Sequence, residues 1–99
     1  MKKLKILIID NDPIINIGLK SIFKNSSIFE ITSFTNCKDE ITDIISQQEI
    51  DLVISEINFK NGTVKDVLKL FKKNNIDIPL IVFTSESNEK KSINLLKLG

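Results

Sequence analysis

Hydrophobic positions along the chain alternate between strand-like and helix-like patterns four times. Residues 3–9 form a nearly continuous aliphatic run, which is typical of a strand covered on both faces of a sheet. The run stops at Asp10 and Asn11, and Asp12 and Pro13 then suit the N-cap and the first position of a helix. The pattern predicts strands at residues 3–9, 28–34, 51–55 and 78–83 and helices at residues 13–24, 37–48, 64 to about 74 and 86–98.

Strands that alternate with helices predict right-handed βαβ units, and hence a parallel sheet with helices on both faces. We expect one α/β domain over residues 1–99, a three-layer sandwich whose strands lie in the order 2-1-3-4. Residues 58–62 are expected to form a loop, and Asn36 is expected to cap the second helix.

The amino-acid composition argues against several classes of function. The chain has 14 Lys and Arg against 13 Asp and Glu, a formal charge of +1, which gives no electrostatic footprint for nucleic acid or a membrane surface. It has no histidine, which excludes histidine-dependent nucleophilic catalysis. Cys37 is the only cysteine and no apolar run could span a bilayer, so a cytoplasmic location is expected.

Polar residues follow three of the four predicted strands. Asp10 and Asn11 end the first, Glu56 ends the third, and Thr84 ends the fourth. The carboxyl ends of parallel strands share one edge of the sheet, where ligands bind in open α/β folds. Oxygen donors without histidine suit Mg²⁺, and a hydroxyl beside a carboxylate can hold a phosphoryl oxygen. Alternatively, each residue simply marks where the chain turns into solvent.

These segments resemble response-regulator receiver domains of two-component signalling and phosphorelays. The residues Ile6-Leu7-Ile8-Ile9-Asp10-Asn11-Asp12-Pro13 are similar to the family's first strand and acidic pair, and Ile78-Pro79-Leu80-Ile81-Val82-Phe83-Thr84 to its fourth strand and switch hydroxyl. Residues 51–58 resemble the third strand with its phospho-acceptor. The segment after Asp12 is closest to the branch that carries a C-terminal LuxR-type helix-turn-helix.

The resemblance implies a flavodoxin-like fold and assigns roles to particular residues. Glu56 stands at the acceptor position, where the family has aspartate, and Thr84 is the switch hydroxyl. Asp10, Asn11 and Asn58 stand at the Mg²⁺ site, which we expect to be weak or lost because Asn11 replaces a carboxylate. No catalytic residue is assigned, and we expect a regulatory domain of a transcription or signalling regulator that is not phosphorylated and is not an enzyme.

Three alternatives remain open at this stage. Glu56 could imitate the charge of a phosphorylated acceptor. The domain could also be an active, Mg²⁺-dependent phospho-accepting receiver. A flavodoxin-like small-molecule binder is a further alternative, although no glycine-rich phosphate loop follows the first strand. Lys60 is expected to be a solvated loop residue, though it could approach Glu56 in place of the family's lysine.

The family's fifth strand and fifth helix are missing from the sequence, which ends at Gly99. We therefore expect the N-terminal part of a longer regulator, which would contact DNA only through a domain outside these residues. Without a fifth strand, residues 80–83 would form an open sheet edge. We expect that edge to bind protein partners or a second copy of the chain.

Overall fold

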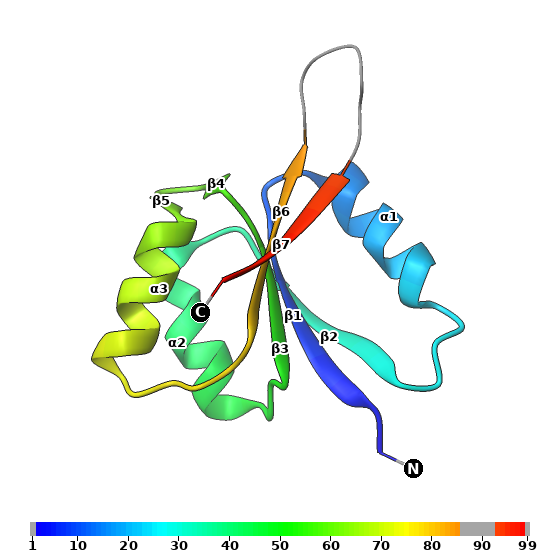
Figure 1. The fold of residues 1–99 in the computed structure, drawn as a ribbon, viewed down its shortest axis with the longest axis horizontal. Helices are drawn as coiled ribbons and strands as arrows, with labels where there is room; N and C mark the ends of the chain where they lie inside the picture. The colour runs from blue at the N-terminus through cyan, green and yellow to red at the C-terminus, as the bar shows by residue number, and fades with distance from the viewer. Residues whose placement is uncertain (1, 86–92, 99) are drawn as a thin grey trace.

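The computed structural model describes the backbone of residues 2–85 and 93–98 and the side chains of residues 2–83. A five-stranded sheet of order β2-β1-β3-β6-β7 forms the middle layer, with α1 on one side and α2 and α3 on the other (Figure 1). A short hairpin, β4-β5, with two residues in each strand, precedes α3. The elements are β1 (Leu4–Ile9), α1 (Pro13–Phe23), β2 (Phe29–Thr35), α2 (Lys38–Gln47), β3 (Leu52–Glu56), β4 (Asn58–Phe59), β5 (Gly62–Thr63), α3 (Val64–Lys73), β6 (Leu80–Ser85) and β7 (Ile93–Leu98).

The four predicted strands pair in parallel in the predicted order, β2-β1-β3-β6. In the central pairs, Ile8 lies opposite Ile54, and Ile54 lies opposite Ile81. The last four residues of β1 are fully buried, as expected for a strand covered on both faces. The α/β sandwich predicted from the sequence is therefore confirmed.

Successive residues of the central strands supply opposite faces of the core. Leu7, Ile9 and Val53 pack with residues of α2 and α3, including Ile41 and Val67. The residues between them face α1 and form a second cluster. This cluster consists of the buried residues Ile6, Ile8, Leu19, Ile54 and Phe83. The period-two alternation of a strand thus divides one hydrophobic run between two layers of the core.

Helix ends follow local capping chemistry. Asp12 caps α1 as predicted, because its Oδ1 accepts a hydrogen bond from the backbone N–H of Ile14 at 2.9 Å, and Pro13 fills the next position. The prediction that Asn36 caps α2 is wrong, since the N-cap is Cys37, without a side-chain hydrogen bond. Residues 58–62, predicted as a loop, contribute the β4-β5 hairpin instead.

The helix predicted over residues 86–98 is wrong for residues 93–98. These form β7, which pairs antiparallel with β6, so that Ile81 lies opposite Lys97. A short apolar run does not by itself distinguish a strand from a helix. Residues 93–98 form a strand because the backbone groups of β6 that β3 leaves unpaired supply hydrogen-bond partners for them. Residues 86–92 and Gly99 lie outside the described residues.

The position of β7 also corrects the expectation of an open edge at residues 80–83. β6 is an interior strand, flanked by β3 and β7. Pairing with another chain through the edge of β6 therefore has no structural basis. Within the parts of the chain that the structure describes, no helix has the length and hydrophobicity needed to cross a membrane.

Candidate functional site

The carboxyl ends of β1, β3 and β6 lie side by side. Ile9 pairs with Ser55, and Glu56 pairs with Phe83. Asp10, directly after β1, and Glu56, at the end of β3, therefore lie at the same edge of the sheet. The backbone of Thr84 follows Phe83 in β6 and pairs with Asn94. The side chain of Thr84, including its hydroxyl group, lies outside the side chains that the structure describes.

The side chains of Asp10 and Glu56 interact at this edge. Asp10 is only 3% exposed, and its Oδ1 accepts a hydrogen bond from the backbone N–H of Asp12 at 3.2 Å. Burial raises the pKa of Glu56 to about 8, helped by a hydrogen bond to Asp10 and by the negative charges of Asp10 and Asp12. At neutral pH Glu56 is therefore largely protonated.

Asp10 Oδ2 is buried and has no hydrogen-bond partner among the described residues. A buried carboxylate oxygen without a donor is costly, and a protonated Glu56, whose pKa is raised beside Asp10, is placed to relieve that cost.

Asn11 connects the end of β1 to the β4-β5 hairpin. Its Oδ1 accepts a hydrogen bond from the backbone N–H of Lys60 at 2.7 Å. This bond ties the turn after β1 to the β4-β5 hairpin, 49 residues further along the chain. A neutral carboxamide thus makes a protein contact at the position where the receiver resemblance implies a metal-binding carboxylate.

Asn61 anchors the same hairpin to the start of α2. Its Oδ1 accepts a hydrogen bond from the backbone N–H of Lys38 at 3.0 Å, and its Nδ2 donates to Asp39 Oδ2 at 3.3 Å. Asn61 has a φ of 55°, in the left-handed region that Asn tolerates better than most residues. The hairpin is therefore held from two directions, by Asn11 and by Asn61.

Gly62 completes the hairpin at a position where a side chain would crowd its neighbours. A Cβ atom at this position would lie 3.1 Å from the Phe59 ring and 3.2 Å from Asp66 Oδ2. Asp66 Oδ2 also accepts a hydrogen bond from the backbone N–H of Thr63 at 2.8 Å, which fixes the entry into α3.

The remaining predicted residues lie at the margin of the site. Asn58 is exposed and pairs with Thr63 in the hairpin. Lys60 is exposed, and the one ion pair found within residues 2–83 joins Lys2 to Glu49, so Lys60 does not pair with Glu56 there. Sequence reasoning missed Asn61, although the Asn-Gly dipeptide at residues 61–62 is a known signal for a tight turn.

The donor set fits Mg²⁺ poorly. No cluster of three or more Asp, Glu or Cys side chains among the described residues has a metal-binding arrangement. The raised pKa of Glu56 leaves its carboxyl group largely neutral near pH 7, and the Asn11 oxygen already accepts a hydrogen bond from the backbone N–H of Lys60. A divalent cation would have to displace the proton of Glu56 and compete for the oxygen of Asn11.

Comparison with known proteins identifies the family. The model of the response regulator receiver domain matches residues 6–99. This chain belongs to the response regulator receiver family. The receiver domain is also 25% identical over 97 residues to a nitrate/nitrite response regulator protein homolog of Haemophilus influenzae. That match includes 98% of this chain and 47% of the relative, so the chain spans about half the length of the curated relative it matches.

Solved structures support the same fold. The non-phosphorylated receiver domain of RcsB from Escherichia coli has a TM-score of 0.75 and 16% identity, over 88% of this receiver domain and 69% of that chain. The MaeR response regulator bound to beryllium trifluoride has a TM-score of 0.75 and 19% identity, over 86% and 70% of the two chains. RcsB from Salmonella typhimurium, over 89% of this receiver domain and 46% of that chain, also has a TM-score of 0.75 and 16% identity.

Proposed function

We propose that this receiver domain regulates a bacterial-type signalling or transcription regulator without accepting a phosphoryl group. Its output would pass through protein–protein contacts. The observation that carries the proposal is the contact between Glu56, at the acceptor position, and the buried Asp10. Receiver domains are signalling modules. Three features of the site in this domain bear on whether it accepts a phosphoryl group.

The first point is the nucleophile. An acceptor must attack a phosphorus atom as a charged carboxylate, whereas Glu56, with its pKa raised to about 8, is largely neutral near pH 7. Glutamate is also one methylene longer than aspartate, which displaces the attacking oxygen by about 1 Å, and a misplacement of that size can cost about a hundredfold in rate. Both effects disfavour phosphorylation.

The second point is charge neutralisation. Phosphoryl transfer depends on cations and donors that stabilise the negative charge of the moving group. Asn11 supplies no charge for a cation, and its oxygen already accepts a hydrogen bond from Lys60. The proposed role therefore assigns no cofactor to the domain, and any Mg²⁺ binding by Asp10, Asn11 and Asn58 would be weak.

The third point is the conformational state. A protonated Glu56 carries no charge, so it does not imitate a phosphoryl group. The β4-β5 hairpin is tied to Asn11 and to the start of α2 through Asn61, which favours one fixed arrangement of the site. We infer that the domain works in a single state and presents a constant surface to its partners.

The output of such a domain would lie elsewhere in a longer protein. RcsB, which shares the fold, has been solved in complex with DNA. We propose that DNA binding by this regulator, if it occurs, uses a domain outside residues 1–99, because these residues have a formal charge of only +1.

Incubation with acetyl phosphate and Mg²⁺, followed by intact mass spectrometry, tests the proposal. We compare the unaltered chain with Glu56→Asp and with the double variant Asn11→Asp, Glu56→Asp, which restores both acidic groups. We expect added phosphate only where the acceptor is aspartate, and more in the double variant. A double variant that folds but stays unmodified would overturn the assignment of residue 56 as the acceptor position.

A further inference from the structure

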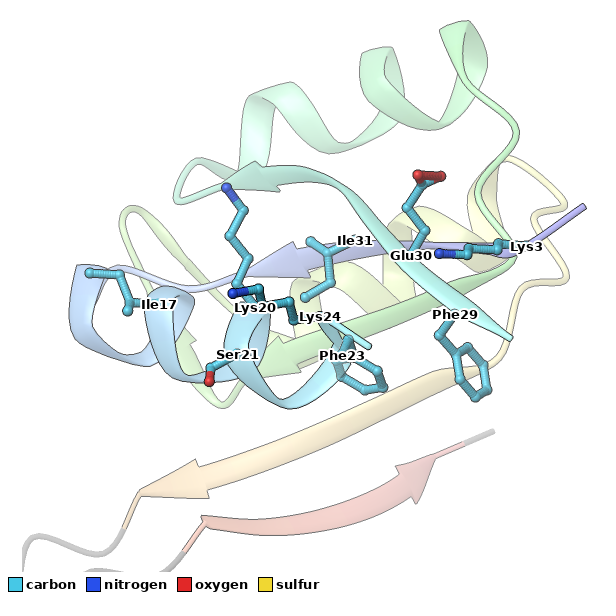
Figure 2. Close-up of a pocket in the computed structure, with 9 residues that line it drawn as sticks. All are labelled: Lys3, Ile17, Lys20, Ser21, Phe23, Lys24, Phe29, Glu30 and Ile31. Atoms are coloured by element: carbon cyan, nitrogen blue, oxygen red, sulfur yellow. The ribbon is translucent and has the colours of Figure 1, made fainter. Parts of the chain in front are cut away.

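A groove lies between α1 and the first half of β2, away from the edge that carries Asp10 and Glu56. It has a volume of about 490 Å³ (Figure 2). Its floor is apolar and includes Ile17, Phe23, Phe29 and Ile31. The Phe23 and Phe29 rings pack edge to face, with centroids 5.8 Å apart. Ile17 is 68% exposed, so the apolar surface of the groove continues onto the outer face of α1.

The rim of the groove is basic. Lys3, Lys20 and Lys24 surround the floor and Glu30 is the one acidic residue, so three positive charges and one negative charge leave an excess of two. All four side chains are exposed. Lys20 is also held in place, because its Nζ lies 5.3 Å from the centre of the Phe34 ring. An apolar floor inside a basic rim is complementary to a ligand that is both acidic and apolar.

The groove borders a sheet edge. β2 is the first strand of the order β2-β1-β3-β6-β7, and among the described strands only β1 pairs with it. An edge strand presents backbone N–H and C=O groups that a further strand can pair with. In β2, Phe29 and Ile31 are half-buried while Glu30 and Thr32 are exposed, so alternate side chains face the α1 side.

We propose that this groove binds an extended acidic segment of a partner protein, which adds to the free edge of β2 as a further strand. Backbone hydrogen bonds to β2 would hold the segment. Apolar side chains on the α1 face of the segment would pack over Phe29 and Ile31, and carboxylates on that same face would lie near Lys20 and Lys24. The proposal is independent of the acceptor chemistry, since the groove shares no residue with the Asp10 and Glu56 contact.

Strand addition favours the first part of β2. The pairing of β1 with β2 shifts between Ile6 and Leu7, so that Thr32 is an extra residue in β2. Such a bulge bends and twists the strand and interrupts regular pairing. The bulge leaves two regular stretches of β2, Phe29–Ile31 and Ser33–Thr35, and only the first of them lines the groove. We therefore place the added strand beside Phe29–Ile31.

The test uses the whole 99-residue chain and a synthetic peptide of about eight residues in which threonine occupies every second position and valine and glutamate share the positions between, so that both lie on one face of the added strand. Binding is followed by NMR, through backbone amide shifts and hydrogen exchange. We expect saturable binding, with slower exchange of amides in β2 only. A peptide with lysine in place of glutamate should not bind. Equal binding of the two peptides, or acidic-peptide binding that leaves exchange in β2 unchanged, would overturn the proposal.

Charge reversal supplies the matched variants. Lys20→Glu with Lys24→Glu should weaken acidic-peptide binding about tenfold, because two attractive rim charges become repulsive. Lys65→Glu with Lys73→Glu changes the net charge equally on α3, across the sheet (Figure 1), and should leave binding unchanged. Equal effects of the two double variants would contradict the assignment.

Two other occupants are tested in the same way. Decanoate, an anionic amphiphile without a backbone, should leave the exchange of β2 amides unchanged. If decanoate saturates the groove and the peptide does not bind, the groove is a lipid-like site and the proposal fails. If sedimentation shows that the chain dimerises through β2 without peptide, a second copy is the occupant and the proposal also fails.

Discussion

The Oδ1 atom of Asn11 accepts a hydrogen bond from the backbone N–H of Lys60 at 2.7 Å and so joins the end of β1 to the segment that follows β3. In a receiver domain these two segments border the acceptor. The contact provides a neutral link between them, made by the residue at the position where the receiver resemblance implies a metal-binding carboxylate. It explains how the site can be held together without a cation.

This link predicts the effect of truncating Asn11. Asn11→Ala removes the acceptor for the Lys60 N–H, and we expect a loss of about 1 kcal/mol in the free energy of unfolding together with faster hydrogen exchange at Lys60. Urea denaturation and amide exchange measure the two effects. Asn11→Asp is the control, since it keeps an oxygen acceptor and should preserve the slow exchange at Lys60. Unchanged exchange in Asn11→Ala would contradict the link.

The Glu56 and Asp10 contact predicts a pH dependence of stability. Folding raises the pKa of Glu56 from 4.5 to about 8, so the folded chain binds more protons than the unfolded chain between these values. The free energy of unfolding should therefore fall as the pH rises through this window. The contribution of the protonated Glu56 is complete below about pH 4.5 and lost above about pH 8.

Glu56→Gln isolates this contribution. The glutamine amide can still donate to Asp10 but does not titrate, so the variant should lose less stability than the unaltered chain between pH 4.5 and about 8. Urea denaturation of both chains across the window measures the difference. Parallel curves would mean that residue 56 does not titrate abnormally in the folded chain.

The two asparagines with positive φ predict opposite outcomes for substitution by glycine. Asn61 and Asn75 have φ values of 55° and 54°. Asn75→Gly, just past the end of α3, should stabilise the chain by about 0.5–1 kcal/mol, because glycine adopts this conformation without strain. Asn61→Gly has the same backbone benefit but loses the hydrogen bonds to Lys38 and Asp39, so it should be neutral or destabilising. Thermal unfolding of the pair tests whether those bonds contribute.

The packing of the central strands predicts a large effect at Ile54. This residue is 1% exposed and lies between Ile8 and Ile81 in the sheet, so Ile54→Ala should cost about 2–5 kcal/mol. Ile22→Ala, at a position that is 68% exposed on α1, should change stability by less than about 0.5 kcal/mol. Similar losses in the two variants would contradict the assignment of the core.

The sequence predicts the parallel part of the sheet well because its signals are local and strong. The aliphatic run that ends at Asp10, and the cap made by Asp12, each specify their structure within a few residues. Residues 93–98 lack such a signal, since their run of apolar residues suits either a helix or a strand. Their strand depends on the open edge of β6, a partner that local pattern does not reveal.

In the candidate site, too, the features set by local sequence signals could be predicted, whereas those set by long-range contacts could not. The strand-end rule is enough to predict that Asp10 and Glu56 lie together. The hydrogen bonds made by Asn11 and Asn61 join residues 49 and 23 positions apart, and their partners are backbone groups that carry no sequence signature. The raised pKa of Glu56 depends first on the burial of Glu56 itself and then on the nearness of Asp10, and only the folded packing determines either.

We propose that a largely neutral Glu56 beside Asp10 makes this receiver domain inert towards phosphoryl donors. The most direct measurement is the intact mass of the unaltered chain after prolonged incubation with acetyl phosphate and Mg²⁺. We predict that the mass stays that of the free chain. A phosphate adduct that is localised to Glu56 and absent from Glu56→Gln would contradict the claim, and would make the domain an active receiver.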